Sequence, residues 1–329
     1  MPVISIIIPV YNGEKTIEET VRSVLNQRFQ DFEIIIINDG SKDKTLEAIN
    51  QISDSRIQVY SYSNSGQGAS RNRGISQATG EYIAFLDADD LWTPDKLEAQ
   101  LDALQANPAA AVAYSWTDVI DEFGNFLRPG SHLNISGDVY PHLLLTNILE
   151  NGSNPLIRRE AIDRVGGFDE SLPPAEDWDL YLRLAAIYPF IVVPRPQILY
   201  RVYANSASTN VFHLEAVSVK VIEQAFNQVP DSLRYLKSHS LANLYKYLTF
   251  KSLETSSGRI QGFAALHFLV KAIFNDRSFM KQRRIIVSSI LKSLSLIFLP
   301  RQLLEKSRQK LEQFSHTNSL LMHGKLNPF

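Results

Sequence analysis

Four short apolar runs open the sequence, at residues 3–8, 32–37, 57–62 and 82–86. Continuous runs rich in Ile and Val are typical of strands that are buried on both faces of a parallel sheet. Between these runs the apolar residues recur at helical spacing, as from Ile17 to Leu25. Alternation of strand and helix with short connections predicts an α/β fold with a mostly parallel, right-handed, doubly wound sheet.

The pattern changes further along the chain. Strand-like runs lie at residues 110–120, 153–158, 190–193 and 198–202. A helix is predicted to open at Glu176, and helical periodicity dominates from residue 211 onwards. We therefore predict two parts: an α/β domain at residues 1–210 and a helical C-terminal region at residues 211–329.

Polar residues follow three of the predicted strands. The first strand ends at Pro9, Tyr11 and Asn12, the second at Asp39, and the fourth at residues 87–90. In open sheets of this kind, ligands bind outside the carboxyl ends of the strands. These side chains are therefore expected to converge on one rim of the sheet.

Asp87, Asp89 and Asp90 place three carboxylates within four residues. Close anions repel one another and are costly at a buried edge unless a cation or hydrogen-bond donors offset them. Asp87 and Asp89 suit a hard divalent ion that also binds phosphate oxygens, as Mg²⁺ or Mn²⁺ does. The alternative is a solvated loop in which Asp caps the next helix.

Residues 65–74 form a glycine-containing loop that is predicted to enter a helix. A dinucleotide-binding loop is not indicated, because the GxGxxG pattern is incomplete and follows the third strand. Arg71 is a candidate for phosphate binding with help from the helix N-terminus, whereas Arg73 is interpreted as ordinary surface charge. Asp39 is either a helix cap or an acceptor for a nucleobase N–H or a ribose hydroxyl.

Glu176, Asp177 and Trp178 open a helix directly after Pro173-Pro174-Ala175. Acidic residues in a first helical turn are favoured by the helix dipole, so helix-start chemistry is sufficient by itself to account for Glu176 and Asp177. The functional alternative is that Asp177, held at a rigid helix start, serves as a general base. The dipole is expected to lower the pKa of Asp177 and keep it ionised.

Composition narrows the class of protein. A net charge of −2 and a pI near 6.4 argue against a nucleic-acid binder. There is no Cys, which excludes disulfides and thiolate metal sites and is consistent with the cytoplasm. The N-terminus enters a strand without a signal-like segment, so we expect a cytoplasmic protein.

The C-terminal region contains a basic, apolar segment. Residues 285–300 are interrupted by Lys292 and fall short of the ~20 apolar residues that a membrane span needs. Residues 281–310 hold eight Lys or Arg and one acid, Glu305. This combination predicts contact with a membrane surface, with the protein peripheral on the inner face of the plasma membrane. A helical subdomain that packs on the catalytic domain is the alternative.

Seven segments of the chain resemble, in the same order, segments of a known enzyme family. They are PVYNGEKTIEETVRSVLNQ, INDGSKDKT, GASRNRGI, YIAFLDADDLW, GGFDE, AEDWDLYLRLA and YRVYANSAS. Over about residues 3–210 the chain resembles family 2 glycosyltransferases of the bacterial polysaccharide-biosynthesis type, which are inverting enzymes with a GT-A fold. The resemblance implies sugar transfer from a UDP- or GDP-linked donor to a saccharide or lipid-linked acceptor. It also implies Mg²⁺ or Mn²⁺ as the cofactor and a place in cell-surface polysaccharide or glycolipid synthesis.

The resemblance further implies roles for single residues. The expected nucleotide-sugar-binding residues are Pro9, Tyr11, Asn12, Asp39, Arg71, Asp87 and Ala88. Asp89 resembles the metal ligand of the DxD motif, Asp177 resembles the catalytic base, and Glu176 and Trp178 are expected on the acceptor side. Many relatives have His where Tyr203 stands, so water or Asp90 is the expected substitute ligand.

Two other functions are weighed against sugar transfer. A nucleotidyltransferase needs a basic loop that grips a triphosphate soon after the first strand, where only Lys15 stands. A non-catalytic nucleotide-sugar-binding protein is disfavoured because Asp87, Asp89 and Asp177 are all present.

Overall fold

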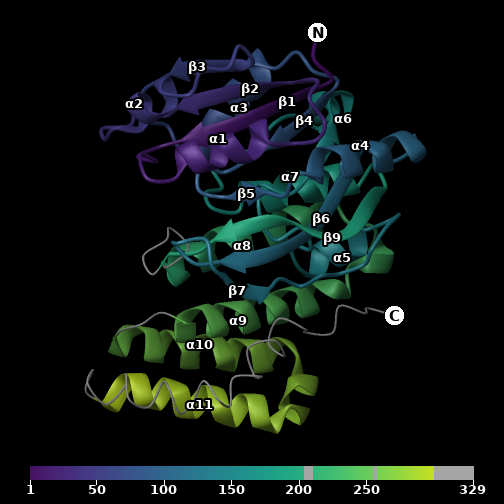
Figure 1. Cartoon of the computed structure of the whole chain (residues 1–329). Coiled ribbons are helices and arrows are strands. Elements are labelled where there is room, and N and C mark those ends of the chain that lie inside the picture. Colours follow the sequence, from purple (N-terminus) through teal and green to yellow (C-terminus); the bar gives the residue numbers. More distant parts are fainter. Residues whose placement is uncertain (204–209, 255–257, 300–329) are drawn as a thin grey trace. The chain divides into compact units, whose positions relative to one another are not determined.

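The computed structural model describes residues 1–203, 210–254 and 258–299 of the chain (Figure 1). The chain divides into two compact units, which are described separately. Unit 1 comprises residues 1–143 and 147–203, and unit 2 comprises residues 144–146 and 204–329. The boundary expected between residues 210 and 211 stays a prediction, whereas the two compact units divide after Tyr203. Helix α8 (Val211–Gln228) begins in unit 2, and the Asn210 side chain accepts a hydrogen bond from the N–H of His213 there.

The first half of unit 1 is the predicted parallel sheet. Its strands are β1 (Ile4–Val10), β2 (Phe32–Asn38), β3 (Ile57–Ser61) and β4 (Tyr82–Phe85). β2 and β4 flank β1, and β3 pairs with β2, all in parallel. The connecting helices are α1 (Ile17–Leu25), α2 (Thr45–Asn50) and α3 (Gln67–Gln77). Val10, Asn38 and Ser61 lie opposite one another in register, so three strands end at one rim of the sheet.

The second half extends the same sheet with mixed directions. Its strands are β5 (Leu91–Trp92), β6 (Val112–Ile120), β7 (Phe126–Pro129), β8 (Leu156–Arg158) and β9 (Phe190–Arg201). β8 lies antiparallel between β4 and β6, while β9 runs parallel to β6 and antiparallel to β5. The two late strand segments expected from the sequence are one strand, β9. Pro194 and Pro196 interrupt its apolar pattern, and its register against β6 shifts there.

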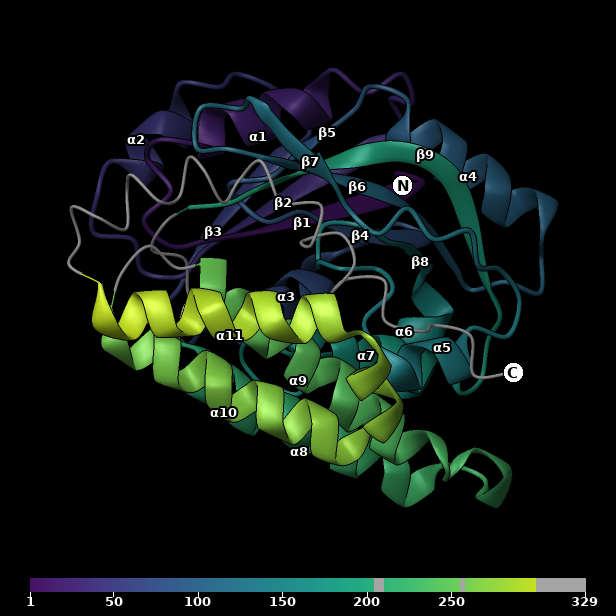
Figure 2. The same ribbon diagram turned by 90° about the horizontal axis from the view of Figure 1, so that it is seen from below.

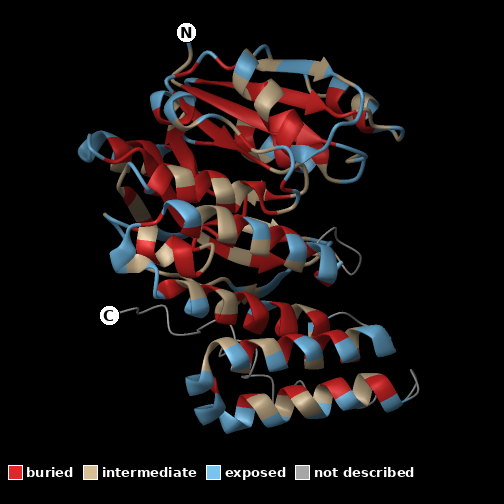
Figure 3. Cartoon of the chain, turned by 180° about the vertical axis from the view of Figure 1, so that it is seen from behind, coloured by how far each residue is buried: buried red, intermediate tan, exposed pale blue. Residues whose placement is uncertain are grey.

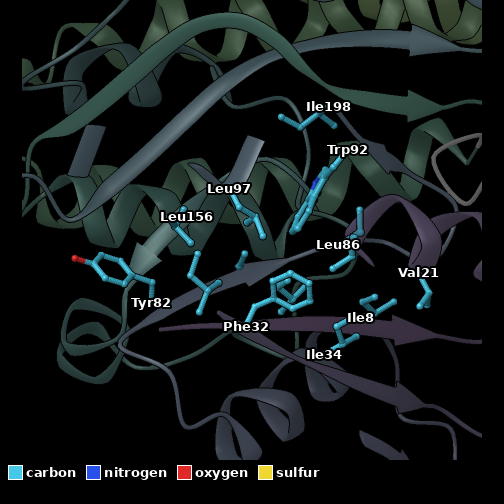
Figure 4. Packing of buried hydrophobic residues seen from close by; sticks show 14 of the residues in the cluster. Ile8, Val21, Phe32, Ile34, Tyr82, Leu86, Trp92, Leu97, Leu156 and Ile198 are labelled. Carbon is cyan, nitrogen blue, oxygen red and sulfur yellow. The ribbon is translucent and has the colours of Figure 1, made fainter. Parts of the chain in front are cut away.

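Alternating residues of the strands pack on two covered faces of the sheet. Apolar side chains of β1, β2 and β4 form one cluster with α1 and with α4 (Lys96–Ala106), and its members include Ile8, Val21 and Leu97 (Figure 4). On the opposite face α3 packs closely, since a Cβ at Gly74 would lie 2.3 Å from Cγ2 of Ile7. The remaining helices are α5 (Tyr140–Leu145), which carries residues of both units, α6 (Arg159–Val165) and α7 (Glu176–Ala185).

Unit 2 is helical throughout its described residues. After α8 come the 3-10 helix η2 (Asp231–Leu233), α9 (Leu236–Glu254), α10 (Arg259–Asn275), the 3-10 helix η3 (Arg277–Lys281) and α11 (Arg283–Phe298). α10 packs on α9 and on α11, and Figure 2 shows α10 and α11 lying side by side. Across the described part of the chain, no helix combines the length and apolarity needed to cross a bilayer.

Candidate active site

The loops after β1 and β2 are tied together at the rim. Asn12 has a positive φ of 53°, a conformation that Asn tolerates better than most residues. Its N–H donates to the Ser41 hydroxyl, and its side-chain oxygen accepts the N–H of Lys42. The N–H of Gly13 donates to the Thr45 hydroxyl at 2.8 Å. The two loops thus form one ordered edge at the predicted nucleotide side.

Asp39 is buried and orders the segment that leads into α3. Its carboxylate accepts the N–H groups of Ser65 and Gly66 at 2.8–3.1 Å and pairs with Arg73 at 3.1 Å. The Arg73 guanidinium also lies 4.5 Å from the ring centre of Tyr62. The interpretation of Arg73 as ordinary surface charge was therefore wrong, since Arg73 pairs with a buried carboxylate. The pair could not be inferred from the sequence because Asp39 lies 34 positions away.

Arg71 is a buried cation that joins carboxylates from distant parts of unit 1. Its Nη2 donates to Asp87 at 2.7 Å and its Nη1 to Glu176 at 3.3 Å. Gln67 also donates to Asp87, at 2.6 Å. The guanidinium occupies the space beside Gly152, where a Cβ would lie 2.3 Å from Nη2. Residues 65–74 were expected to form a loop that enters a helix. The helix α3 already begins at Gln67, so most of these residues, Arg71 included, are helical.

A buried polar loop at residues 151–154 supports the acidic loop, and the sequence analysis missed this role. The Ser153 hydroxyl accepts the N–H of Asp87 and donates to Asp90 at 2.5 Å. Asn151 donates to Thr117, and Asn154 exchanges hydrogen bonds with the Ser115 backbone. The available signal was the short polar run Asn-Gly-Ser-Asn before an apolar strand, which alone does not reveal burial.

Asp90 is a structural residue rather than a free ligand. It is fully buried, and burial raises its pKa well above the ordinary value, with the charges of Asp89 and Asp87 adding to the effect. One of its oxygens accepts from Ser153 and the other from the N–H of Arg201 at 2.9 Å. Both oxygens are engaged, which does not fit the expected use of Asp90 as a substitute metal ligand.

Asp89 lies in an electronegative part of the rim. Burial and the nearby Asp87 raise the pKa of Asp89 to about 6. The Arg201 guanidinium donates to the Asp89 carbonyl at 2.8 Å and fixes the backbone there. Burial, together with the charge of Asp89, raises the pKa of Tyr203 to about 12. Tyr203 thus lies close enough to Asp89 to interact with it electrostatically.

Glu176 and Asp177 lie at the start of α7, close to the buried guanidinium of Arg71. Burial raises the pKa of Glu176, although Arg71 opposes this. The Oε2 atom of Glu176 is buried and has no hydrogen-bond partner among the residues that the structure describes. Burial and the charge of Glu176 raise the pKa of Asp177 to about 7. The prediction that the helix dipole lowers the pKa of Asp177 was wrong, because these two effects are larger.

Both carboxylate oxygens of Asp177 have a donor nearby. The N–H of Trp178 donates to Oδ1 at 2.7 Å, and the side-chain amide of Asn147 donates to Oδ2 at 3.4 Å. The N–H of Leu149 donates to the amide oxygen of Asn147, which turns its nitrogen towards Asp177. Asn147 is a second residue that the sequence analysis did not single out.

The remaining predicted residues differ in exposure. Pro9 is buried in β1, Tyr11 is 49% exposed, and the Ala88 carbonyl accepts the Thr20 hydroxyl at 3.0 Å. Trp178 is buried, and its indole N–H donates to the Leu143 carbonyl at 2.9 Å. We therefore leave Trp178 out of the acceptor contacts proposed below.

The acidic rim was also considered as a metal site. Within the described ranges, no group of three or more His, Cys, Asp or Glu side chains is arranged to hold a metal ion. Asp87 and Asp89 form a two-carboxylate pair, and burial, with the charge of Asp87 adding to it, raises the pKa of Asp89. Such a pair fits a cation that takes its other ligands from phosphate oxygens and water.

Comparison with known proteins places the chain in a family. The family described as "Glycosyltransferase like family 2" matches residues 5–252, which is 248 of the 329 residues. The chain belongs to this family. Membership favours the glycosyltransferase interpretation over a nucleotidyltransferase or a non-catalytic binding protein.

Relatives with assigned names agree with this placement. The chain is 30% identical to the chondroitin synthase of Escherichia coli over 249 residues, covering 74% of this chain and 35% of that protein. It is 36% identical to an uncharacterized glycosyltransferase of Rickettsia conorii over 191 residues, covering 56% of this chain and 32% of that protein. The chain thus spans about a third of the length of each of these relatives.

Two solved structures share the fold. S. aureus TarS 1–349 aligns with a TM-score of 0.59 at 17% identity, covering 93% of this chain and 91% of that one. The mannosyltransferase PcManGT of Pyrobaculum calidifontis, in complex with GDP-Man and Mn²⁺, aligns with a TM-score of 0.61 at 17% identity, covering 99% and 84%. The expected GT-A fold with C-terminal helices is confirmed.

Proposed function

We propose that the chain transfers a sugar from a nucleoside diphosphate donor to an acceptor hydroxyl with inversion at the anomeric carbon. One observation carries this proposal: the buried Arg71 guanidinium contacts Asp87 on the expected donor side and Glu176 beside the expected base. Acidic groups that lie about 90 residues apart in the sequence therefore meet around one cation. This arrangement brings a leaving-group side and a base side together within unit 1.

The donor side consists of the rim of β1, β2 and β4. Pro9, Tyr11 and Asn12 belong to one loop, and Asp39 holds the segment before α3. We place the nucleoside there and the diphosphate beside residues 87–89. S. aureus TarS has been solved with UDP-GlcNAc and PcManGT with GDP-Man, which supports uridine or guanosine diphosphate sugars as the donor class.

Asp89, with Asp87, would hold Mg²⁺ or Mn²⁺, and PcManGT was solved with Mn²⁺. A bound ion supplies Lewis-acid stabilisation of the negative charge on the leaving diphosphate. Arg71 adds positive charge on the same side and holds the Asp87 carboxylate in place. Ser153 fixes the backbone of this loop through the N–H of Asp87.

Asp177 is the proposed general base. Its carboxylate is oriented by the Trp178 N–H and the Asn147 amide, and its pKa near 7 leaves it ionised at slightly alkaline pH. Asp177 accepts the proton of the acceptor hydroxyl while the acceptor oxygen forms a bond to the anomeric carbon. The bond from that carbon to the diphosphate oxygen breaks, and the nucleoside diphosphate leaves with the bonding electrons.

We propose a saccharide or lipid-linked acceptor, as in cell-surface polysaccharide or glycolipid synthesis at the inner face of the plasma membrane. Glu176 is the proposed acceptor-side neighbour of the base, since it lies directly before Asp177 and one of its oxygens has no hydrogen-bond partner within the described ranges. The basic segment proposed for the membrane surface extends to residue 310, and its part beyond residue 299 lies outside the described residues.

The test is a donor screen that measures release of UDP or GDP from a panel of nucleotide sugars, with Mn²⁺ and with EDTA. We expect release with at least one donor only when the cation is present. Asp89→Ala should weaken cation-dependent nucleotide binding and lower turnover, whereas Asp102→Ala, an exposed position on α4, should change neither. Equal nucleotide affinity of the wild-type protein with Mn²⁺ and with EDTA would contradict the metal-dependent donor site.

A further inference from the structure

Helix α11 (Arg283–Phe298) carries both buried and exposed residues along its length (Figure 3). Its exposed apolar residues recur at spacings of three and four and so share one side of the helix. They are Val287, Leu291, Leu294 and Phe298, which are 53%, 59%, 38% and 74% exposed. The buried residues are Ile285, Ser289, Ser293 and Ile297. A helix that served only to pack within a globular unit would turn most of its large apolar side chains inward, whereas α11 leaves these four exposed.

The buried side of α11 already has its partner within unit 2. A Cβ at Gly262 of α10 would lie 2.7 Å from the Ser293 carbonyl and 2.7 Å from Cγ1 of Ile297, so the two helices approach closely at this glycine. The Ser293 hydroxyl is satisfied within α11, since it donates to the Ser289 carbonyl at 2.7 Å. Contact with α10 therefore explains the small residues of α11 and leaves its exposed apolar side unexplained.

Basic residues accompany the exposed side. Residues 259–299 contain seven Lys or Arg and one acid, Asp276, which binds Lys246 at 3.1 Å and caps η3. Arg283 and Arg284 are exposed in the first turn of α11. Cations at a helix N-terminus oppose the helix dipole and do not stabilise the helix. Their position therefore points to an external anionic partner.

We propose that the outer α11 face, defined as Arg283, Arg284, Val287, Leu291, Leu294 and Phe298, docks on an anionic lipid surface. The 16-residue helix is about 24 Å long and would lie parallel to the bilayer, with its apolar residues at the headgroup boundary. This deepens the proposed function, because docking would bring the enzyme to the surface where lipid-linked acceptors are found. The docking surface itself lies in unit 2 and is independent of the proposed chemistry.

The charge pattern favours lipid over a second copy of this chain. Residues 277–299 contain no Asp or Glu, so a second outer α11 face would offer Arg283 and Arg284 no acidic partner. Anionic headgroups supply that charge over the whole surface. Basic residues close to an anionic membrane each strengthen binding, and salt screens their contribution.

The full-length chain is tested by co-sedimentation with vesicles of phosphatidylcholine alone and of phosphatidylcholine with phosphatidylglycerol. We expect binding only to the anionic vesicles. Arg283→Gln with Arg284→Gln should weaken binding by roughly fivefold for each cation removed. Leu291→Asp should weaken it at least as much. The matched controls, Arg22→Gln with Arg195→Gln and Ile187→Asp, change exposed residues of unit 1 and should bind as the wild type does.

Release of UDP or GDP in solution should be the same in Leu291→Asp as in the wild type, which separates this proposal from the proposed function. Failure of the wild type to bind anionic vesicles at low salt would overturn it. Equal losses of vesicle binding in Leu291→Asp and Ile187→Asp would also overturn it.

Light scattering tests the other occupants of the face. If the wild type is a dimer and Leu291→Asp is a monomer, the outer α11 face binds a second copy of the chain. Binding that appears only after removal of residues 300–329 would assign it to that segment.

Discussion

At Asp177 two local effects oppose each other. The start of a helix lowers the pKa of a carboxyl group, whereas burial and a neighbouring negative charge raise it. Burial and Glu176 are the larger effects, and the pKa is about 7. A general base is most effective when its pKa lies near the working pH. The helix start thus gives Asp177 a fixed orientation, and its surroundings give it basicity.

The rate of sugar transfer should rise with pH through about 7, because Asp177 accepts a proton only when it is ionised. Glu176→Gln removes the negative charge beside it, which lowers the pKa of Asp177 and moves the acid limb of the profile to lower pH. The measurement is kcat/KM against pH. Asp179→Asn is the matched control, since Asp179 lies in the same helical turn but pairs with Arg183, and it should leave the limb in place.

Asp177→Asn completes this test. It should lower transfer by about 10²–10⁴-fold, the usual cost of losing general-base catalysis, and preserve nucleotide affinity. Near-normal transfer by this variant would remove Asp177 from the mechanism. An acid limb that does not move in Glu176→Gln would show that the neighbouring charge does not set the pKa of the base.

At the scale of elements, local patterns predicted much of the fold. The four parallel strands were predicted because each is a continuous apolar run, and the helices between them because their apolar spacing is regular. The loop at residues 151–154 could not be predicted in this way. Its residues are small and polar, and their burial depends on hydrogen bonds to Asp87, Asp90 and Thr117.

In the candidate site, too, features with a local sequence pattern could be predicted, and features that depend on contacts between distant residues could not. Asp89 follows β4, and Asp177 is the second residue of α7, so the position of each along the elements could be predicted from its segment, whereas their roles stay predictions. The contact between Arg71 and Glu176 spans 105 positions and could not be inferred from spacing. The pKa of Asp177 was predicted in the wrong direction for the same reason, since burial is a property of the assembled unit.

Gly152→Ala tests the loop as an element that positions Arg71. The new Cβ would lie 2.3 Å from Nη2 of a buried guanidinium, so Arg71 would move away from Asp87. We expect a loss of about 1–3 kcal/mol in the free energy of unfolding, as for other overpacked cores, and weaker donor binding. Urea unfolding and nucleotide titration measure the two effects.

Gly68→Ala is the control for this substitution. A Cβ there meets its nearest atom, Cα of Glu170, at 3.6 Å, which is ordinary contact, and Ala favours the helix. It should leave the free energy of unfolding unchanged or raise it slightly. Equal destabilisation by both substitutions would show that the space beside Gly152 has no special role.

At the scale of the whole molecule, the burial of one lysine lowers the stability of the folded protein. Lys96 is fully buried, its Nζ has no hydrogen-bond partner among the described residues, and the nitrogen lies 3.8 Å from the ring centre of Trp92. Burial lowers the pKa of Lys96 well below its ordinary value. Between the lowered pKa and the unfolded value of about 10.4, the unfolded chain binds the proton more tightly, which favours unfolding.

Lys96→Met should therefore raise the free energy of unfolding of unit 1, by about 1–3 kcal/mol at pH 7. The gain should shrink as the pH rises towards about 10.4, where the unfolded lysine also loses its proton. Thermal unfolding across this pH range measures the difference from the wild type. Lys15→Met, at an exposed lysine of the same unit, should give no such trend. A gain of constant size at all pH values would rule out ionisation as its cause.

The contacts of Arg201 have a consequence for the order in which the site is made. Arg201 is the last residue of β9, and it contacts Asp90 through its N–H, the Asp89 carbonyl through Nε and Glu19 through Nη2. During synthesis, the acidic loop leaves the ribosome more than a hundred residues before this partner. The nascent chain can thus carry every donor-side carboxylate while the loop that presents them still lacks its support. Competence to bind the donor should arise only after Arg201 has been synthesised and the end of β9 has been added to the sheet.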